Sequence, residues 1–393
     1  MARLTFTRST TSLTLTGLLS LAVAMGIGRF AFTPQLPLMV QEGLLDVAQG
    51  GWLAAANYVG YLVGALTASR LRGGASVLAM ISLAGVALTA AAMALPGAML
   101  WMPLRFLAGV CSAWAFVATS VWCLGALARA NRQDLSAWVY SGVGFGMAIV
   151  GLYCLAAAIT GVRSQQVWVH LALLTTTAFV PVFLVARSLG IELQKAPSKL
   201  DQNPPLPAGT VGLVVSYAIM GFGYILPATY LPVLARSVVE NPAVFGLAWP
   251  IFGATAALST LVAGALMQRI SRLRVWAGCQ ALMGLGTLLP SLWRHEASFM
   301  LSAIFVGGTF MVITLAGVQE IRARVPSNPG AWVGYLTAAF ALGQIAGPVS
   351  TALLFSLPGL ADQALSIGLQ LAAFSLFGSA AWLWSATCRA TAL

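Results

Sequence analysis

The sequence predicts an all-α fold: a polytopic membrane protein with twelve transmembrane helices in two six-helix, pseudo-symmetric bundles. Three observations lead to this fold class. The 393 residues are 59% hydrophobic and only 7% charged, whereas soluble domains carry about 25% charged residues. Twelve apolar runs approach or exceed the roughly 20 residues that a helix needs to span a bilayer. Motifs of the first half recur in the same order in the second half.

The twelve apolar runs are too long and too uniformly apolar for barrel strands, which alternate over about 10 residues. Helices are the remaining way to satisfy the backbone in hydrocarbon. Spans are therefore expected at residues 13–39, 50–69, 75–95, 98–127, 136–160, 167–188, 210–235, 244–267, 275–293, 298–319, 331–356 and 364–387. A polar break separates six runs from six. We expect an N-terminal six-helix bundle (1–189), a cytoplasmic linker (190–209) and a C-terminal six-helix bundle (210–393).

Basic residues predict the orientation in the membrane. Most of the 20 Lys and Arg residues fall near the chain ends or in every second loop. Because positively charged loops stay on the cytoplasmic side, we expect both termini and the linker to be cytoplasmic. The net charge of +11 then follows from membrane topology. The expected partners are the lipid bilayer and a small-molecule solute, and not nucleic acid.

The two halves repeat a segment that opens the first span of each. Residues 25–39 read Met-Gly-Ile-Gly-Arg-Phe-Ala-Phe-Thr-Pro-Gln-Leu-Pro-Leu-Met, and residues 220–234 read Met-Gly-Phe-Gly-Tyr-Ile-Leu-Pro-Ala-Thr-Tyr-Leu-Pro-Val-Leu. The offset is 195 residues, from Gly26 to Gly221. Corresponding spans run the same way, so the halves should be related by an axis along the membrane normal. Repeated halves in an apolar chain favour a secondary transporter.

Three further motifs lie in the first half. Residues 64–72 are a degenerate form of a Gly-x-Leu-x-x-Asp-Arg-x-Gly-Arg loop, with Ala68 near the place of the Asp. Arg105-x-x-x-Gly109 is an intramembrane arginine motif, and residues 142–151 are rich in glycine. In this order along twelve spans, the motifs resemble the major facilitator superfamily over essentially the whole chain. The segments Gly-Ile-Gly-Arg-Phe-Ala-Phe-Thr-Pro and Gly-Trp-Leu-Ala-Ala-Ala-Asn-Tyr-Val-Gly-Tyr-Leu resemble its YbfB/YjiJ-like branch.

The resemblance implies a monomeric transporter of the bacterial inner membrane that works by alternating access, and not an enzyme. It also implies a cytoplasmic gate after the second span of each half, at Arg70, Arg72, Arg272 and Arg274. Proton coupling is an expectation of the superfamily. None of the nine acidic residues lies at a span centre. Glu320 is the candidate proton relay and His170 a second, although Glu320 could instead pair with Arg322 or Arg324.

Arg29 is the clearest candidate for solute binding. A charged side chain at mid-span costs about 2.5–3.5 kcal/mol, so it should face a cavity or a partner. Arg29 lies 11 residues before Val40, about 16 Å from the end of the span at helical rise. Arg105 lies at a similar depth. We expect Arg29, with Arg105, to bind an anionic group such as a carboxylate. The alternative is that one or both brace neighbouring helices through backbone carbonyls.

Other polar residues on the expected cavity faces complete the candidate site. Tyr224 takes the place of Arg29 in the second half, so the cavity should be basic on one side and aromatic on the other. The full set of candidate binding residues is Arg29, Thr33, Asn57, Tyr61, Arg105, Tyr224, Tyr230 and Gln344. Each of the added residues could instead serve helix packing or bond between helices.

The function predicted from these patterns is secondary active transport of a small organic solute, anionic or amphiphilic, with proton-coupled export as one option. The alternative is a polytopic membrane enzyme or lipid-handling protein. Against that alternative, the sequence holds no nucleophile elbow, catalytic cluster or metal-ligand spacing. The five cysteines show no CxxC or Cys/His pattern, so no metal site and no cofactor are expected.

Overall fold

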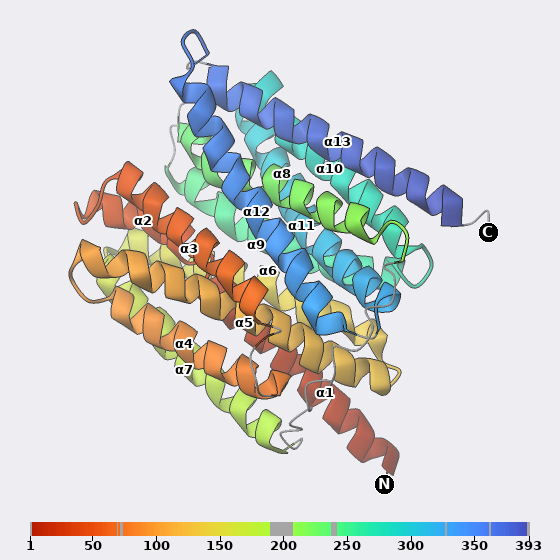
Figure 1. Ribbon diagram of the computed structural model, residues 1–393. Coiled ribbons are helices and arrows are strands. Elements are labelled where there is room, and N and C mark those ends of the chain that lie inside the picture. Colours follow the sequence, from red (N-terminus) through yellow and green to blue (C-terminus); the bar gives the residue numbers. More distant parts are fainter. Residues whose placement is uncertain are drawn as a thin grey trace.

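The computed structural model describes residues 2–68, 70, 74–188, 207–236, 242–326, 328–360 and 363–390, and every regular element among them is a helix (Figure 1). The first half contains α1 (Ala2–Leu21), η1 (Ala22–Ile27), α2 (Phe32–Gln41), α3 (Val47–Thr67), α4 (Ala75–Met93), α5 (Ala98–Arg129), η2 (Gln133–Leu135), α6 (Ser136–Thr160) and α7 (Ser164–Ser188). The second half contains α8 (Thr210–Arg236), α9 (Pro242–Leu266), α10 (Arg272–Leu292), α11 (Glu296–Arg324), α12 (Pro329–Ser356) and α13 (Ala364–Ala390). The predicted all-α fold class is confirmed for this part of the chain.

Eleven segments of the described chain are long and apolar enough to cross a membrane. They coincide with eleven of the twelve predicted runs. The remaining run, 50–69, corresponds to α3, a 21-residue helix whose Gln49, Asn57 and four glycines make it less apolar. The count of twelve spans therefore stays a prediction. The predicted linker lies mostly outside the described residues.

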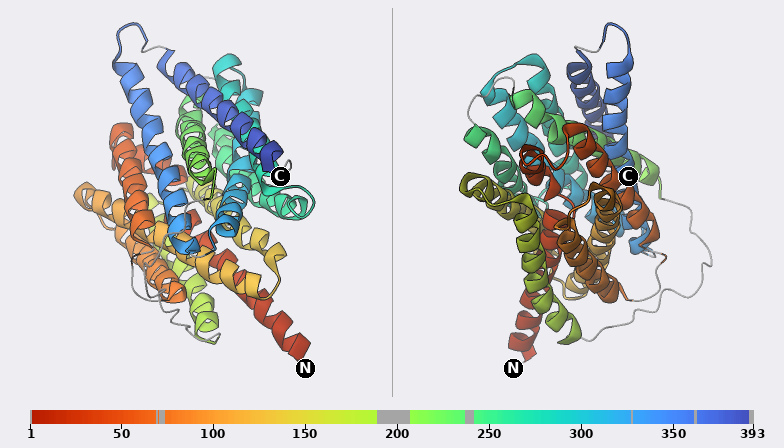
Figure 2. Two further views of the ribbon diagram at one scale, coloured as in Figure 1. Left: turned by 45° about the vertical axis from the view of Figure 1, so that its right-hand side comes forward. Right: turned by 90° about the vertical axis from the view of Figure 1, so that its left-hand side faces the viewer.

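Helices of each half pack mainly against one another. In the first half α5 lies against α3 and α4, and in the second half α10 lies against α11 and α13. The first half, red to yellow, lies at the lower left of Figure 1, and the second, green to blue, at the upper right. The halves meet mainly where α6 packs on α9 and where α12 packs on α3. Figure 2 shows the whole helical bundle from two further directions.

Glycines allow the α6–α9 contact to be close. A Cβ atom added to Gly144 would lie 2.7 Å from the carbonyl oxygen of Gly253, and one added to Gly253 would lie 2.9 Å from that of Gly144. Real Cβ contacts are essentially never shorter than 3.0 Å. Small residues at such crossings let two membrane helices approach backbone to backbone. This contact therefore seats one half of the chain directly on the other.

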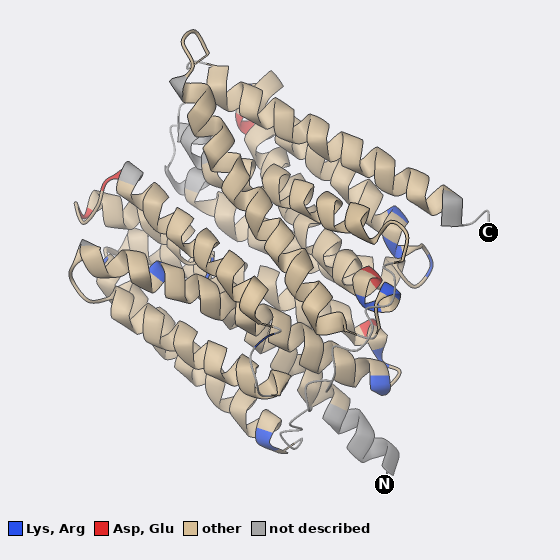
Figure 3. Ribbon diagram, in the orientation of Figure 1, with Lys and Arg blue, Asp and Glu red and all other residues tan. Residues whose placement is uncertain are grey.

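The two ends of the helical bundle differ in their charged residues (Figure 3). We call one of them the basic end, because most of the blue Lys and Arg positions of Figure 3 gather there. The arginines at the helix ends on this side are Arg129, Arg132, Arg187, Arg269, Arg272, Arg274, Arg322 and Arg324. The opposite end contains Glu42, Asp46, Arg163, Arg294 and Glu296. The helix interiors between them are almost free of charge, with Arg29 and Arg105 as the exceptions in the described chain. This distribution is what the loop charges of the sequence predict.

The first span, which the sequence predicts as one run over residues 13–39, is broken in the structure. After α1 the chain forms a π-helix, η1, in which Gly28 N–H donates to Val23 O (3.2 Å) and Phe30 N–H to Met25 O (2.9 Å). Residues 28–31 then turn before α2 begins. Pro34 has no N–H to bond to the Phe30 carbonyl, so a continuous α-helix would lose this bond. The break falls among Gly26, Gly28 and Pro34, and it places Arg29 in the turn.

Candidate functional site

Arg29 lies inside the fold, between the two halves. Its side chain is 2% exposed, and its Nη2 donates a hydrogen bond to Gln344 Oε1 in α12. The guanidinium carbon lies 3.7 Å from the ring centroid of Tyr61 in α3. Its Nε and Nη1 have no hydrogen-bond partner, and no described carboxylate forms an ion pair with it. Arg29 is therefore a buried cation that contacts only neutral groups in the described chain, and two of its nitrogen atoms have no hydrogen-bond acceptor.

Arg105 in α5 makes a different set of contacts. Its Nη2 donates to the carbonyl of Arg29 (3.1 Å) and its Nη1 to the carbonyl of Gly28 (3.4 Å). The Asn57 side chain donates to the carbonyls of Arg105 (2.9 Å) and Gly28 (3.4 Å). Ser112 Oγ donates to the carbonyl of Ala24 in η1 (2.8 Å). Arg105, Asn57 and Ser112 thus donate hydrogen bonds to carbonyls at and just before the turn in the first span, and Asn57 also ties the turn to α5.

The contacts thus divide the two arginines into different roles. Arg105, with Asn57, braces the turn through backbone carbonyls, which is the alternative considered for it from sequence. The Arg29 side chain makes no such contact with a carbonyl and points toward the second half. Direct binding of an anion stays the prediction for Arg29, while the geometry favours a positioning role for Arg105.

An aromatic cluster adjoins Arg29. It consists of Phe30, Tyr224, Trp249, Phe252, Phe310 and Phe340, from the first span, α8, α9, α11 and α12. The rings of Tyr224 and Phe310 stack with centroids 4.9 Å apart, and those of Trp249 and Phe252 stack at 5.5 Å. The rings of Phe30 and Phe340 each lie 5.3 Å from the Arg29 guanidinium carbon. One side of the arginine is therefore continuous with an apolar, aromatic interior.

Not all predicted binding residues meet here. Tyr224 is fully buried in the cluster, and its hydroxyl has no hydrogen-bond partner. Thr33 follows Arg29 by four residues, a spacing that shares one face of a regular helix, but residues 28–31 form a turn instead. Thr33 is half-buried in α2, and its backbone N–H donates to Phe30 O (3.2 Å). The side chain of Tyr230 lies outside the described part of the structure.

Sequence reasoning missed most of the aromatic cluster. Phe30, Trp249, Phe252 and Phe310 come from three separate spans, and each alone resembles an ordinary packing residue. Phe30 directly follows Arg29, which is the one local signal that a cation and a ring share the site. From the second half the sequence indicates Tyr224 as a facing ring, but not Trp249, Phe252, Phe310 or Phe340.

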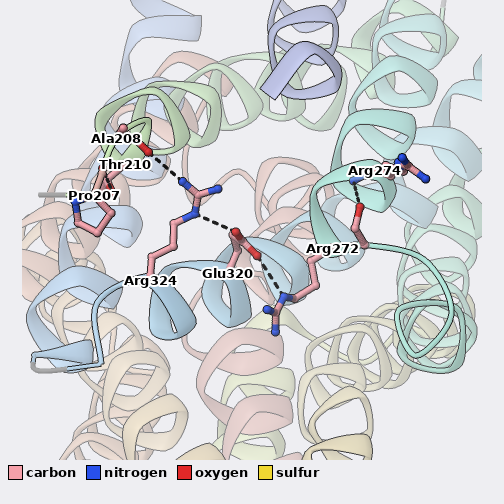
Figure 4. A network of polar contacts seen from close by, with 8 residues as sticks. Pro207, Ala208, Thr210, Arg272, Arg274, Glu320 and Arg324 are labelled. Atoms are coloured by element: carbon pink, nitrogen blue, oxygen red, sulfur yellow. Dashed lines mark hydrogen bonds and ion pairs between the residues drawn. The ribbon is translucent and has the colours of Figure 1, made fainter. Parts of the chain in front are cut away.

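A polar network occupies the basic end (Figure 4). The two oxygens of Glu320 accept hydrogen bonds from Arg272 (3.1 Å) and Arg324 (2.8 Å), and Arg324 also donates to the carbonyl of Ala208 (3.1 Å). These bonds tie the ends of α10 and α11 to the start of α8. Arg274 is exposed, and in Figure 4 its side chain points away from Glu320.

The outcome for the gate residues is mixed. Arg272 belongs to the network, Arg70 is exposed after α3, and Arg72 lies outside the described residues. The predicted pairing of Glu320 with Arg324 is confirmed, and Arg272 is an additional partner. A cavity of about 660 Å³ lies beside the network, between the ends of α9, α10, α11 and α13 and the loop that contains Asp134. A gate and a proton relay at these residues both stay predictions.

His170 in α7 is the second candidate for a proton relay. Its ring is exposed and shares a hydrogen bond with the hydroxyl of Tyr153 in α6. It lies far along the chain from the Glu320 network and makes no described contact with it. The relay role of His170 likewise stays a prediction.

The halves also touch at the basic end. Arg322 in α11 donates to the carbonyl of Ser120 in α5 (3.0 Å). A Cβ on Gly334 in α12 would lie 2.9 Å from the carbonyl of Ala65 in α3. Both contacts join the first half to the second on the basic side of Arg29. The two halves are therefore in contact between Arg29 and the basic end in this conformation.

A comparison with protein families agrees with the all-helical fold described above. Within the described chain no three His, Cys, Asp or Glu side chains lie close enough together to hold a metal ion. A family model described as an uncharacterised MFS-type transporter YbfB matches residues 21–380. None of the curated proteins compared with the chain matches it. Because the match covers nearly the whole chain, the protein belongs to the YbfB-like branch of the major facilitator superfamily of membrane transporters.

Proposed function

We propose that the protein is a secondary active transporter that carries a small organic anion across the membrane by alternating access, with Arg29 as the anion-binding group. One observation carries the proposal. Arg29 is buried between the two halves, and two of its nitrogens have no hydrogen-bond partner. An intramembrane charge without a counter-charge is costly and marks a site that a ligand completes.

The architecture that we propose for this function has twelve spans in two six-helix bundles, with α3 as the span that composition alone does not identify. The Arg29–Gln344 bond joins the bundles at the site, because Arg29 belongs to the first and Gln344 to the second. A solute that binds Arg29 then changes a contact between the two bundles. Alternating access needs such a link between occupancy and the relative position of the halves.

The basic end is the cytoplasmic end in this proposal, since positively charged loops remain in the cytoplasm. The conformation described above is then closed toward the cytoplasm through Arg322 and Gly334. Inner-membrane location, cytoplasmic termini and a monomeric state complete the proposal. Arg272 and Glu320 belong to the proposed cytoplasmic gate, and they act within the second bundle.

Transport in liposomes tests the proposal. Purified full-length protein is reconstituted, and uptake of labelled mono- and dicarboxylates is measured with and without unlabelled acid inside. A carrier shows saturable uptake that internal acid accelerates, whereas an enzyme or a lipid-handling protein does not. Arg29→Gln should abolish this counterflow, and Arg294→Gln, at an exposed arginine of the opposite end, should not. Wild-type counterflow in folded Arg29→Gln would exclude Arg29 as the binding group.

Proton coupling is the further part of the proposal, and it is tested in the same vesicles. An imposed pH gradient should drive accumulation of the acid, and the sign of the gradient that does so gives the direction of coupled flux. Glu320→Gln then tests the predicted relay, as set out below.

A further inference from the structure

We propose that the solute is a planar aromatic monocarboxylate whose carboxylate binds Arg29 and whose ring enters the aromatic cluster. This proposal rests on the proposed function of Arg29 and goes beyond it by assigning the solute's chemical class. It draws on three features of the site: the number of free donors on Arg29, the neutral partner Gln344, and the position of the rings.

The charge of the site favours a single carboxylate. The buried Arg29 guanidinium has one described hydrogen-bond acceptor, Gln344 Oε1, and its Nε and Nη1 are unpaired. A carboxylate offers two oxygens to a guanidinium fork and the counter-charge that an amide lacks. Arg105 does not provide a second anion site of this kind, because both of its terminal nitrogens bond to carbonyls.

Gln344 occupies the place of one carboxylate oxygen. Its Oε1 accepts from Arg29 Nη2 as a carboxylate oxygen would, and its own Nε2 is buried without a partner. The amide therefore stands in for an acidic ligand in this conformation. A solute carboxylate that takes over Nη2 frees Gln344, whose Nε2 and Oε1 can then bond to the solute or shift with α12.

The rings define the other half of the solute. The rings of Phe30 and Phe340 flank the guanidinium, and each also contacts one ring of the stacked pair Tyr224 and Phe310. The ring centroids of Phe30 and Phe310 are 6.5 Å apart, and those of Phe340 and Tyr224 are 5.9 Å apart. A group attached to a carboxylate at Arg29 therefore meets aromatic faces and edges on leaving the guanidinium. In this conformation the rings contact each other, so a solute ring replaces one of these ring–ring contacts.

An aromatic solute should bind here with a more favourable free energy than an aliphatic solute of the same size. Burial of hydrocarbon from water favours an aromatic and an aliphatic ring alike, so it does not by itself discriminate between them. Ring quadrupoles add a preference for offset-stacked and edge-to-face partners. Tyr224 Oη and Trp249 Nε1 are also buried without partners, so an oxygen on the solute ring would satisfy a donor there. An organic cation is excluded by the charge of Arg29.

Binding of four probes of similar size to the purified full-length protein tests the assignment. The probes are benzoate, cyclohexanecarboxylate, benzamide and hexanoate, and affinity is measured by calorimetry in lipid nanodiscs. Benzoate should bind about tenfold tighter than cyclohexanecarboxylate, the equivalent of about 1.4 kcal/mol from ring contacts. Benzamide, which has the ring but not the charge, should bind at least about 30-fold more weakly than benzoate.

Variants separate the ring site from the charge site. Phe310→Leu should remove most of the preference for benzoate over cyclohexanecarboxylate, and Trp249→Leu provides a second test if Phe310→Leu does not fold. Phe374→Leu, at an exposed ring of α13, is the control. Gln344→Glu should supply an internal carboxylate to Arg29 and so abolish binding of all three acids while the protein remains folded.

The outcomes distinguish the two proposals. Equal affinity for benzoate and cyclohexanecarboxylate, unchanged by Phe310→Leu or Trp249→Leu, would overturn the aromatic assignment. If those affinities still fell in Arg29→Gln, the proposed function would stand. If no acid bound the wild-type protein, or if binding were unchanged in folded Arg29→Gln, the proposed function itself would fail, and the aromatic assignment with it.

Discussion

Gly26→Ala should destabilise the protein and disturb the Arg29 site together. Gly26 lies in the π-helix η1, which is pressed against the backbone of α6. A Cβ atom at this position would lie 2.7 Å from both Cα and C of Gly146. Ordinary contact begins at 3.4 Å, so η1 must move away from α6 by about 0.7 Å. The atoms it meets belong to the backbone, so no side-chain rotation relieves the contact.

The expected cost is that of overpacking a tightly packed interior, about 1–3 kcal/mol. The matched control is Gly278→Ala in α10, where a Cβ would meet nothing within 4 Å. Both substitutions replace a glycine within a helix by alanine, and this replacement by itself stabilises the folded protein by about 0.5–1 kcal/mol. The difference between the two variants therefore measures the contact with Gly146.

Equilibrium unfolding in mixed micelles, followed by circular dichroism, provides the comparison. We expect Gly26→Ala to be less stable than Gly278→Ala by at least about 1 kcal/mol. Benzoate affinity should also fall, because the turn that carries Arg29 begins two residues after Gly26. Equal stability of the two variants would refute the reasoning that η1 and α6 meet at backbone contact.

Three further substitutions test the bracing, the network at the basic end and the closed conformation. Arg105→Gln removes the two bonds to the carbonyls of residues 28 and 29 and should cost about 2–3 kcal/mol in unfolding free energy; a variant as stable as the wild type would contradict the bracing role. Glu320→Gln should keep counterflow but lose uptake driven by a pH gradient, if Glu320 is the relay; gradient-driven uptake at the wild-type rate would remove it from that role. Arg322→Gln loses the bond to Ser120 and should shift the equilibrium toward opening at the basic end by about tenfold, the equivalent of one charge-assisted hydrogen bond. Maleimide labelling of Ala65→Cys, which lies against Gly334, measures that opening, and an unchanged labelling rate would argue against it.

Composition predicts much of this fold, because a chain so apolar must satisfy its backbone within helices. The bend in the first span was also predictable, since Pro34 and Pro37 lack the N–H groups that a continuous helix needs. The π-helix at residues 22–27 was not, and the close approach of its Gly26 to Gly146 in another span follows only from the fold. α3 shows the converse limit, where the buried Asn57, the exposed Gln49 and four glycines lower the hydropathy of a helix of spanning length.

The charged residues of the site were predictable from the sequence, but the residues that contact them were not. A lone arginine in an apolar span identifies Arg29 at once. Whether Arg105 binds a solute or braces the backbone depends on which carbonyls the turn leaves unpaired, and that follows only from the fold. Arg272 pairs with Glu320 although 48 residues separate them, and local spacing predicts only the Arg324 pair. The aromatic cluster joins six residues from five helices or turns, with only Trp249 and Phe252 on the same helix.

The two buried arginines have an electrical consequence. Within the described chain no carboxylate neutralises them, so the empty carrier holds fixed positive charge within the low-dielectric interior. One charge displaced across the full membrane potential changes in energy by about 2.3 kcal/mol per 100 mV. A bound monoanion lowers the mobile charge by one. The loaded and empty carriers should therefore respond differently to voltage, and exchange of one anion for another should be less sensitive to membrane potential than net flux.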